Sequence, residues 1–476
     1  MAKRLWSYYG ISIAVLATTL AAVIHFGPHS AIVEAKQTAS APLAGLIANI
    51  HSPLGQALLQ VLVIVVAARC VGSIFTRLGQ PAVIGEMAVG IALGPSLLGT
   101  VWPSAAKFLF PASSLGSLSI LSQVGILLFM FVVGMELDVR LLKSKARTAV
   151  LVSHASIILP FCLGLTSALW LYGRYSGTNP SFLAFALFMG ISMSITAFPV
   201  LARIIQERGL AGTEIGSVAV TCAAVDDVTA WVALAFIVAL ARAQSMVGCL
   251  VTVVLAVCVV LAVVYVMRPL LERSVERSPD PGNPGKTLTV AVFVCVFACA
   301  LSTESIGVHA LFGAFLSGVA MPKQHAFRTF LRQRIEYFST LFLVPIFFAF
   351  TGLRTQVGLL STSTDWLICF GLLTLAIAGK FGGSTLAARA SGMSWRDSTA
   401  LGALMNTRGL IELIALNLGL DLGVLSPKIF AMLVLMALIT TFMTGPVITL
   451  LGVGFWSDRE GAHVNVSEVT AIETVN

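Results

Sequence analysis

Charged side chains are scarce in this chain of 476 residues, because Asp, Glu, Lys and Arg make up only 11% of it while 57% of its residues are hydrophobic. Ordinary soluble domains carry about a quarter charged residues. A chain with so few charges could not cover a water-facing surface of its own size. The composition therefore excludes a soluble globular protein and predicts a polytopic membrane protein, with the lipid bilayer as its main partner.

Metal-binding and nucleic-acid-binding patterns are also missing. The eight cysteines form no CxxC pair and no Cys/His cluster, so we interpret them as small core residues. The net charge of +8 comes from Lys and Arg residues in short loops between apolar segments. This positive-inside pattern determines membrane orientation, and it predicts no nucleic-acid partner.

Long apolar runs occupy most of the chain. We count about 14 segments long enough to cross about 30 Å of hydrocarbon, some with the help of tilt or a break. They are 7–26, 54–75, 81–98, 117–135, 146–172, 181–206, 212–241, 246–270, 287–302, 306–321, 335–353, 366–388, 396–419 and 428–452. The first is either a cleaved signal peptide or an extra first helix, and sequence alone does not separate the two.

The distribution of basic residues orients these segments. With the N-terminus in the cytoplasm and strict alternation of sides, about 20 Lys and Arg fall in cytoplasmic loops, about 6 outside and about 3 within spans. This bias predicts a multi-pass protein of the cell (inner) membrane with both termini in the cytoplasm.

An internal repeat divides the chain. Three segments of the first half recur in the same order in the second: 83–90 as 311–318, 128–137 as 346–353, and 192–210 as 403–420. The offset is seven spans, an odd number, so the halves must have opposite orientations. Inverted repeats are typical of secondary transporters, with the binding site at the midplane between them. We expect an N-terminal segment 1–53, a first repeat 54–241, a linker helix and cytoplasmic loop 242–286, a second repeat 287–452 and a short tail 453–476.

Two adjacent acids, Asp226 and Asp227, lie at the centre of the span 212–241. A charge at that depth costs about 2.5–3.5 kcal/mol on insertion scales. One buried Asp can have a structural role, but two in succession are hard to explain structurally. Neighbouring carboxylates with different surroundings have different proton affinities, which suits a site that exchanges protons for a cation.

Lys380 lies deep in the span 366–388, beside glycines. The side chain could snorkel toward the cytoplasmic interface, or pair with one aspartate and lose its proton when that partner does. Glu86 and Glu412 also lie in spans, where helix packing, charge balance and ion contact remain open.

Two spans carry the marks of broken helices. In the first, Pro199 removes a backbone donor in mid-span and disfavours helix at Phe198, which leaves the hydroxyls of Ser194 and Thr196 beside freed carbonyls. In the second, Asn406, Thr407, Arg408 and Gly409 interrupt an apolar run. The interruptions occupy equivalent positions in the two halves, which is the strongest sequence pointer to a transporter site.

These motifs resemble the second monovalent cation:proton antiporter family, and within it the CHX-type and Kef-type cation/proton exchangers. The resemblance covers residues 54–452 and rests on 198–205, on Asp226-Asp227 followed by 229–231, and on 406–413. Many relatives end in a large cytosolic regulatory domain, whereas only about 20 residues follow the last span here, with no Gly-rich nucleotide fingerprint.

The resemblance implies a sodium/proton-antiporter fold: an all-α membrane protein of two inverted six-helix repeats, with two crossing discontinuous helices, a core domain and a dimerisation domain, and hence a homodimer. It implies exchange of Na+ or K+ for protons, with no cofactor and no enzymatic activity. It places the cation at Asp227 and Asp226, and pairs Lys380 with Asp226. The crossing-helix residues are Ser194, Thr196, Phe198, Pro199, Asn406, Thr407 and Arg408.

Two other functions are possible for a membrane protein with buried aspartates. An intramembrane aspartyl protease needs carboxylates that face each other from separate helices, which adjacent residues on one helix cannot provide. A symporter or membrane sensor of the same fold for an organic anion should show more hydrogen-bond donors and fewer carboxylates. The aspartate pair argues against it.

Overall fold

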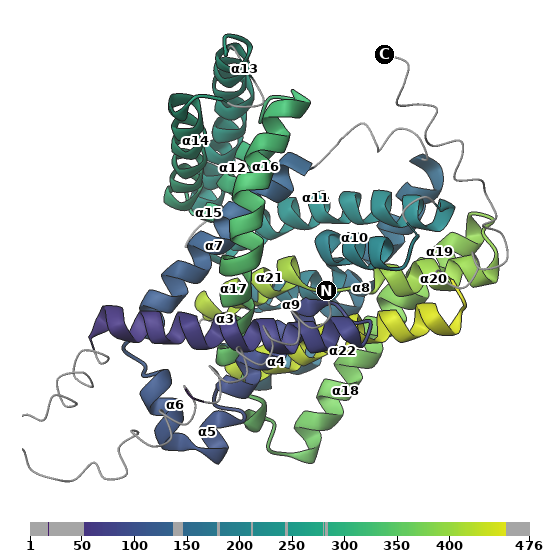
Figure 1. Ribbon diagram of the computed structural model, residues 1–476. Coiled ribbons are helices and arrows are strands. Elements are labelled where there is room, and N and C mark those ends of the chain that lie inside the picture. Colours follow the sequence, from purple (N-terminus) through teal and green to yellow (C-terminus); the bar gives the residue numbers. More distant parts are fainter. Residues whose placement is uncertain are drawn as a thin grey trace, which may run out of the picture.

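The computed structural model describes residue 18 and residues 52–136, 146–178, 181–210, 213–242, 246–278, 280 and 284–453, and the regular structure in them is helical (Figure 1). The α-helices are α3 (Pro53–Arg77), α4 (Ala82–Leu93), α5 (Leu98–Val101), α6 (Pro103–Leu109), α7 (Leu115–Glu136), α8 (Ala146–Tyr175), α9 (Phe182–Ser194), α10 (Phe198–Glu207), α11 (Glu214–Arg242), α12 (Met246–Ala262), α13 (Arg268–Glu276), α14 (Lys286–Ser305), α15 (Ala310–Val319), α16 (His325–Phe338), α17 (Val344–Arg354), α18 (Ser363–Ile377), α19 (Gly383–Ala390), α20 (Trp395–Met405), α21 (Leu410–Asp421) and α22 (Pro427–Leu450). Three π-helical turns, Val263–Met267, Ser339–Leu343 and Ala378–Gly382, join neighbouring helices, and a 3₁₀ turn spans Val357–Leu359.

Helices occupy every predicted segment from 54–75 onward, which confirms an all-helical membrane fold. Not all of the 13 predicted segments from 54–75 onward are single helices long enough to cross a membrane, however. Within the described residues, 10 helices are long and apolar enough to cross a membrane, or up to 11 if the bent pair α20–α21 counts as one span. Short helices explain why fewer helices than predicted segments qualify, because α9 and α15 are apolar but too short to cross a membrane alone. The predicted segment 7–26, apart from residue 18, lies outside the described residues.

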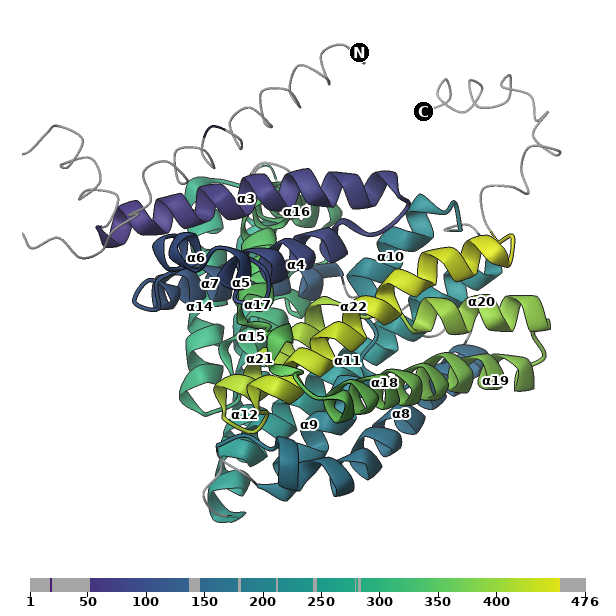
Figure 2. The ribbon, with the colours of Figure 1, turned by 90° about the horizontal axis from the view of Figure 1, so that it is seen from below.

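The helices pack into two bundles that each draw on both halves of the sequence. In one, which we call the α4–α17 bundle, α3, α4, α7, α14, α15 and α17 contact one another. In the other, the aspartate bundle, α8 to α11 pack with α18 to α22. Figure 2 shows α8, α18, α19 and α20 together on the side of the molecule away from α3. Contacts between the bundles are fewer, although one buried hydrophobic cluster contains residues of both.

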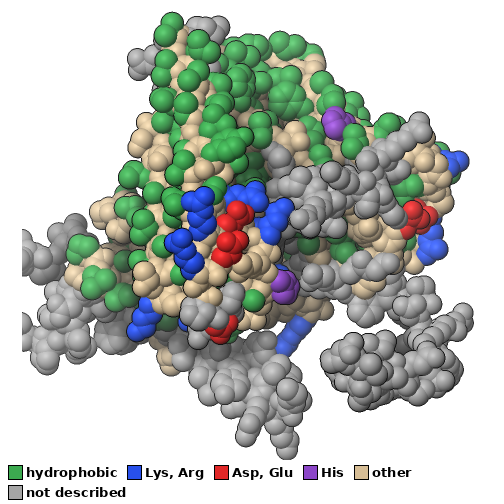
Figure 3. Space-filling view, turned by 90° about the horizontal axis from the view of Figure 1, so that it is seen from above, with side chains coloured by type: hydrophobic (Ala, Val, Ile, Leu, Met, Phe, Trp, Pro, Cys, Tyr) green, Lys and Arg blue, Asp and Glu red, His purple; other side chains and the backbone are tan. Residues whose placement is uncertain are grey.

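Apolar side chains cover much of the outer surface. Along α12 and α14, residues such as Val247, Leu250, Val290 and Val294 are more than half exposed. In Figure 3, green hydrophobic side chains form broad continuous areas, while blue and red charged side chains gather in separate clusters. A surface of this kind is stable against lipid rather than water.

Both predicted broken helices are present. α9 ends at Ser194 and α10 begins at Phe198, with Ile195 to Ala197 extended between them. The expectation that Pro199 disfavours helix at Phe198 is wrong, because Phe198 is the first residue of α10. Proline is tolerated in the first turn of a helix, where its missing N–H would have no intrahelical partner. The second break separates α20 from α21 with a bend of 40°.

Candidate functional site

The two breaks cross each other inside the aspartate bundle. The backbone N–H of Ala197 donates to the carbonyl of Thr407 at 3.0 Å, and the Thr196 hydroxyl lies 3.3 Å from the carbonyl of Met405. Gly409 permits the close approach, because a Cβ atom there would lie 3.0 Å from Val200 Cγ2. The crossing therefore joins residues that are about 200 positions apart in the sequence.

Asp226, on α11, faces this crossing and has no exposed surface. Its Oδ1 accepts a hydrogen bond from the Ser153 hydroxyl at 2.6 Å. Its Oδ2 accepts from the hydroxyls of Thr196 at 2.6 Å and Ser156 at 3.1 Å, and lies 3.5 Å from the ammonium of Lys380. Both carboxylate oxygens of Asp226 are therefore fully engaged, which a buried carboxylate requires.

Asp227 lies in different surroundings. It is 2% exposed, and it accepts a hydrogen bond from the backbone N–H of Phe198, at the N-terminus of α10. Its Oδ1 has no hydrogen-bond partner among the described residues. The two neighbouring carboxylates thus differ: one is saturated with donors, and the other has a free oxygen beside the positive end of a helix.

Lys380 reaches the site from the π-helical turn Ala378–Gly382. Its side chain is fully buried, so the snorkelling interpretation is wrong. Its ammonium donates to the hydroxyl of Ser156 at 3.0 Å, to the carbonyl of Ser156 at 3.1 Å and to the carbonyl of Ser194. Gly379 allows this helix to lie close to α8, since a Cβ atom there would be 3.0 Å from Pro160 Cα.

Arg408 and Glu412 form a second buried ion pair behind the crossing. Arg408 Nη1 lies 3.2 Å from Glu412 Oε1, and both side chains are fully buried. The guanidinium also donates to the carbonyls of Ser192 at 2.6 Å and Met193 at 2.7 Å. Those carbonyls belong to the last turn of α9, where they lack intrahelical partners. Arg408 therefore stabilises the C-terminal end of the broken helix.

Not every predicted side chain points at the aspartates. The Ser194 hydroxyl donates back to the carbonyl of Gly190 at 2.7 Å, so only the Ser194 carbonyl meets Lys380. Asn406 Nδ2 lies 3.5 Å from Met443 Sδ, and the Thr407 hydroxyl lies 3.3 Å from that of Thr444. Asn406 and Thr407 therefore fix α20 against α22 with their side chains.

Sequence reasoning missed Ser153 and Ser156, which supply two of the three hydroxyls on Asp226. They are three residues apart on α8 and so share one helix face. A pair of hydroxyls at that spacing, in an otherwise apolar span, was the available signal. Small hydroxylated residues are common in membrane helices as packing contacts, which makes the signal weak without coordinates.

Comparison with known proteins supports an assignment. The chain is 42% identical over 392 residues to Na(+)/H(+) antiporter NhaS4 of Synechocystis sp., covering 82% of this chain and 96% of that protein. It is 41% identical to Cation/H(+) antiporter 19 of Arabidopsis thaliana and 33% identical to K(+)/H(+) antiporter 1 of Saccharomyces cerevisiae, and it spans about half the length of each (50% and 47%).

A solved structure has the same fold. The sodium proton antiporter MjNhaP1 of Methanocaldococcus jannaschii matches with a TM-score of 0.60 and 13% identity, covering 84% of this chain and 98% of that one. Residues 61–454 also match the family described as "Sodium/hydrogen exchanger, transmembrane". A match over most of the chain, together with the 42% identical relative, means that this multi-pass membrane protein belongs to the sodium/hydrogen exchanger family.

Proposed function

We propose that this chain exchanges Na+ or K+ for protons across the membrane, with Asp227 and Asp226 as the shared cation and proton site. The observation that carries the proposal is the pair of adjacent, buried carboxylates at the crossing of two broken helices. One of these carboxylates, that of Asp227, has an oxygen to which no described residue donates. The printed names of the relatives, all antiporters of Na+, K+ or unspecified cations against protons, support the same activity.

The charges of the site suit exchange. With all groups ionised, Asp226, Asp227 and Glu412 carry three negative charges, and Lys380 and Arg408 carry two positive ones. The remaining negative charge is costly in a membrane interior. One monovalent cation or one proton neutralises it, and the two compete for the same place. Competition of this kind is what couples the movement of one ion to the movement of the other.

The two acids have different roles in this proposal. Asp226 is held by three hydroxyls and the ammonium of Lys380, so it stays in place and sets the local charge. Asp227 binds the cation directly, because its free Oδ1 is available as a ligand. Oxygen ligands are those that hard cations prefer.

We further propose that the two halves are inverted repeats. A Cβ atom on Gly90 would lie 2.2 Å from the carbonyl of Ala349, so α4 packs closely on α17. A Cβ atom on Gly134 would lie 2.2 Å from the carbonyl of Phe315, so α7 packs closely on α15. The sequence repeat pairs 83–90 with 311–318 and 128–137 with 346–353. The repeat therefore makes α4 equivalent to α15 and α7 equivalent to α17. Exchanging the two halves converts the α4–α17 contact into the α15–α7 contact, which supports a two-fold relationship between the halves.

Orientation and assembly belong to the same proposal. The excess of Lys and Arg in alternate loops supports cytoplasmic termini in the cell (inner) membrane. A homodimer is proposed on the family resemblance. An organic-anion symporter or sensor is less suited to the site, because the buried cations Lys380 and Arg408 already bind carboxylates and carbonyls.

The proposal is tested with purified protein in proteoliposomes that contain a pH-sensitive dye. Na+ or K+ added outside should collapse an imposed pH difference with the wild type and not with Asp227→Asn. Asp397→Asn is the matched control, since Asp397 lies in the first turn of α20, bonded to Ser394, away from the carboxylate pair. Retained exchange by Asp227→Asn would refute the assigned site, and no exchange with any alkali cation in the wild type would refute the function.

A further inference from the structure

Polar contacts join the two bundles at one end of their interface. Arg354, the last residue of α17, donates to Asn417 Oδ1 at 2.9 Å and forms an ion pair with Asp421. Asn417 Nδ2 in turn donates to the hydroxyl of Thr351 at 2.9 Å. α17 belongs to the α4–α17 bundle, and Asn417 and Asp421 lie on α21 of the aspartate bundle. We call these four residues the Arg354 latch.

A second ion pair crosses between the bundles near the first. Arg242, at the end of α11, lies 3.3 Å from Glu304, at the end of α14. His309 lies within electrostatic reach of Arg242, Glu304 and Asp421, which places the two pairs in one region. Burial lowers the pKa of the His309 imidazole, and the nearby Glu304 carboxylate opposes this effect.

The exposure of the latch suits a contact that forms and breaks. The side chain of Arg354 is 24% exposed and that of Asp421 is 47% exposed, so water can hydrate both charges once they separate. An ion pair of this kind contributes only modestly. By contrast, Arg408 and Glu412 are fully buried within one bundle and cannot separate without leaving a charge in an apolar interior.

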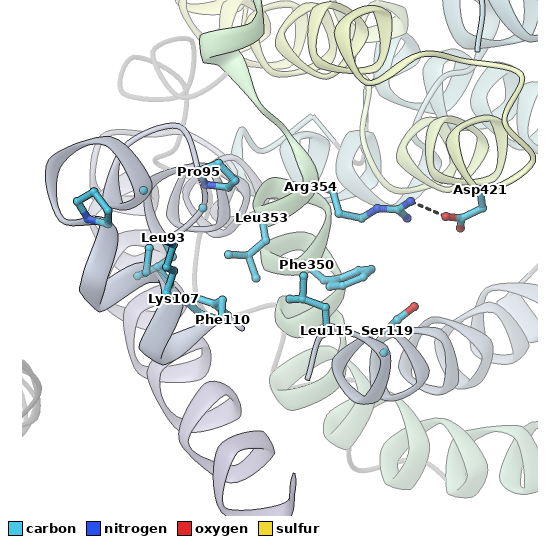
Figure 4. A pocket seen from close by; sticks show the side chains of 15 residues that line it. Leu93, Pro95, Lys107, Phe110, Leu115, Ser119, Phe350, Leu353, Arg354 and Asp421 are labelled. Carbon is cyan, nitrogen blue, oxygen red and sulfur yellow. Dashed lines mark hydrogen bonds and ion pairs between the residues drawn. The ribbon is translucent and has the colours of Figure 1, made fainter. Parts of the chain in front are cut away.

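A cavity adjoins the latch. It has a volume of about 530 Å³ and is lined mainly by apolar groups of α4, α6, α7 and α17, with Phe350 and Leu353 in its wall. Figure 4 shows the Arg354–Asp421 pair along one side of this cavity, with the Leu115 and Ser119 side chains just below Phe350 in this view. The Arg354 guanidinium also lies 5.6 Å from the centre of the Phe350 ring. Space therefore already exists beside the latch for side chains to move when it opens.

We propose that the Arg354 latch is the external gate of the transporter, which holds the two bundles together on the outside and must break before an external ion reaches Asp227. This inference rests on the proposed exchange function and orientation, under which residues 242, 304, 354 and 421 all face outward. The structure is then the state that is closed to the outside, in agreement with the burial of both aspartates.

The test compares the two faces of the membrane. In Arg354→Ala, the apparent KM for cation added to the external face of right-side-out vesicles should fall about two- to fivefold, because a larger fraction of the protein is open outward. The apparent KM at the cytoplasmic face, measured in everted vesicles, should change less, because the latch lies at the external end of the bundles. Arg174→Ala is the matched control, because Arg174 is an exposed arginine at the same end whose described contact is with the neighbouring Tyr175 ring.

Two further measurements keep the result specific. The double variant Arg354→Asp/Asp421→Arg should restore the wild-type apparent KM at each face of the membrane. If Arg354→Ala acted through a folding defect, the double variant would not restore these values. Hydrogen–deuterium exchange in peptides covering 350–358 and 413–423 should rise in Arg354→Ala, stay unchanged in Arg174→Ala and return in the double variant.

The gate proposal would be overturned if Arg354→Ala changed the apparent KM equally at both faces. It would also be overturned if Arg354→Ala behaved like Arg174→Ala. The hydrogen-exchange readout does not need transport, so it separates failure of the gate from failure of the proposed function. A wild type that exchanges no cation would refute the function and leave the latch to be judged by hydrogen exchange alone.

Discussion

Replacing Arg408 with Met should destabilise the protein far more than replacing Glu412 with Gln. Arg408 makes three charge-assisted hydrogen bonds without any exposed surface: to Glu412 at 3.2 Å, Ser192 at 2.6 Å and Met193 at 2.7 Å. Removing one partner of a buried ion pair costs about 3–5 kcal/mol. Each backbone carbonyl left without a hydrogen bond costs about 1–3 kcal/mol. Proton uptake by Glu412 offsets part of this cost, so we expect a loss of roughly 5 kcal/mol.

Glu412→Gln keeps the shape of the side chain and an oxygen that accepts from Arg408. The guanidinium also keeps both backbone carbonyls, so we expect a loss of about 1–2 kcal/mol. The assay is the fraction of purified protein that survives heating as a single size-exclusion peak, measured against temperature in one detergent. Arg408→Met should lower the midpoint by several degrees more than Glu412→Gln.

The opposite ranking, or equal midpoints, would refute the reasoning. It would mean that the carbonyls of α9 find other partners and that Arg408 does not hold the end of that helix. An Arg408→Lys variant adds a check, because an ammonium restores the charge without the planar fork that binds two carbonyls at once. It should fall between the wild type and Arg408→Met.

Three other outcomes are expected. Lys380→Ala should weaken the coupling of cation movement to the pH gradient, seen with the pH-sensitive dye, more than it lowers the amount of folded protein; loss of expression alone would favour a structural role. Ser153→Ala should reduce exchange about two- to tenfold, as expected for loss of one hydrogen bond of about 0.5–1.5 kcal/mol. Ser156→Ala should reduce it more, because the Ser156 hydroxyl bonds both Asp226 and the ammonium of Lys380. Ser167→Ala should not reduce it, since the described bond of its hydroxyl is to the carbonyl of Gly164 in its own helix. Gly90→Ala should abolish folding, seen as loss of the size-exclusion peak, because its Cβ would lie 2.2 Å from a backbone carbonyl, while Gly116→Ala, with open space around it, should be tolerated.

The sequence predicted the helical class, the positions of the spans and the family. It did so because lipid permits few alternatives: every backbone group must be bonded within a helix, so apolar runs of sufficient length mark helices directly. The aspartates, Lys380 and the two interruptions were identifiable for a related reason. Polar groups in an apolar span are costly, and so they are conspicuous.

The partners of those residues were not predictable. Ser153 and Ser156 look like any other small residues of a membrane helix, and only the packing of α8 against α11 shows that they face Asp226. The direction of the Ser194, Asn406 and Thr407 side chains depends on helix rotation, which the sequence pattern of a fully buried helix does not determine. The first break covers Ile195 to Ala197, and helix resumes at Phe198 in spite of Pro199. The rule for residues before proline is weaker here than the preference for proline in a first helical turn.

The broken helix α9–α10 provides, at one place, backbone groups that bind positively charged side chains and a backbone group that binds a negatively charged one. Its first half ends in free carbonyls, which bind Lys380 at Ser194 and Arg408 at Ser192 and Met193. Its second half begins with a free N–H at Phe198, which binds Asp227. A continuous helix would use these groups internally and leave the buried charges without partners.

All of these contacts lie within the aspartate bundle. The hydroxyls on Asp226 come from α8 and the first break, Lys380 comes from the turn before α19, and the Arg408–Glu412 pair lies at the second break. None of these partners is contributed by the α4–α17 bundle. Movement of one bundle against the other would therefore carry the site as a unit and leave its bonds unbroken. The polar contacts that such a movement must break include the latch, in which the Arg354 and Asp421 side chains are 24% and 47% exposed, and the Arg242–Glu304 pair. Under the proposed exchange function, a buried site that stays intact and a weak contact at the boundary of the bundles would together allow the site to face each side of the membrane in turn.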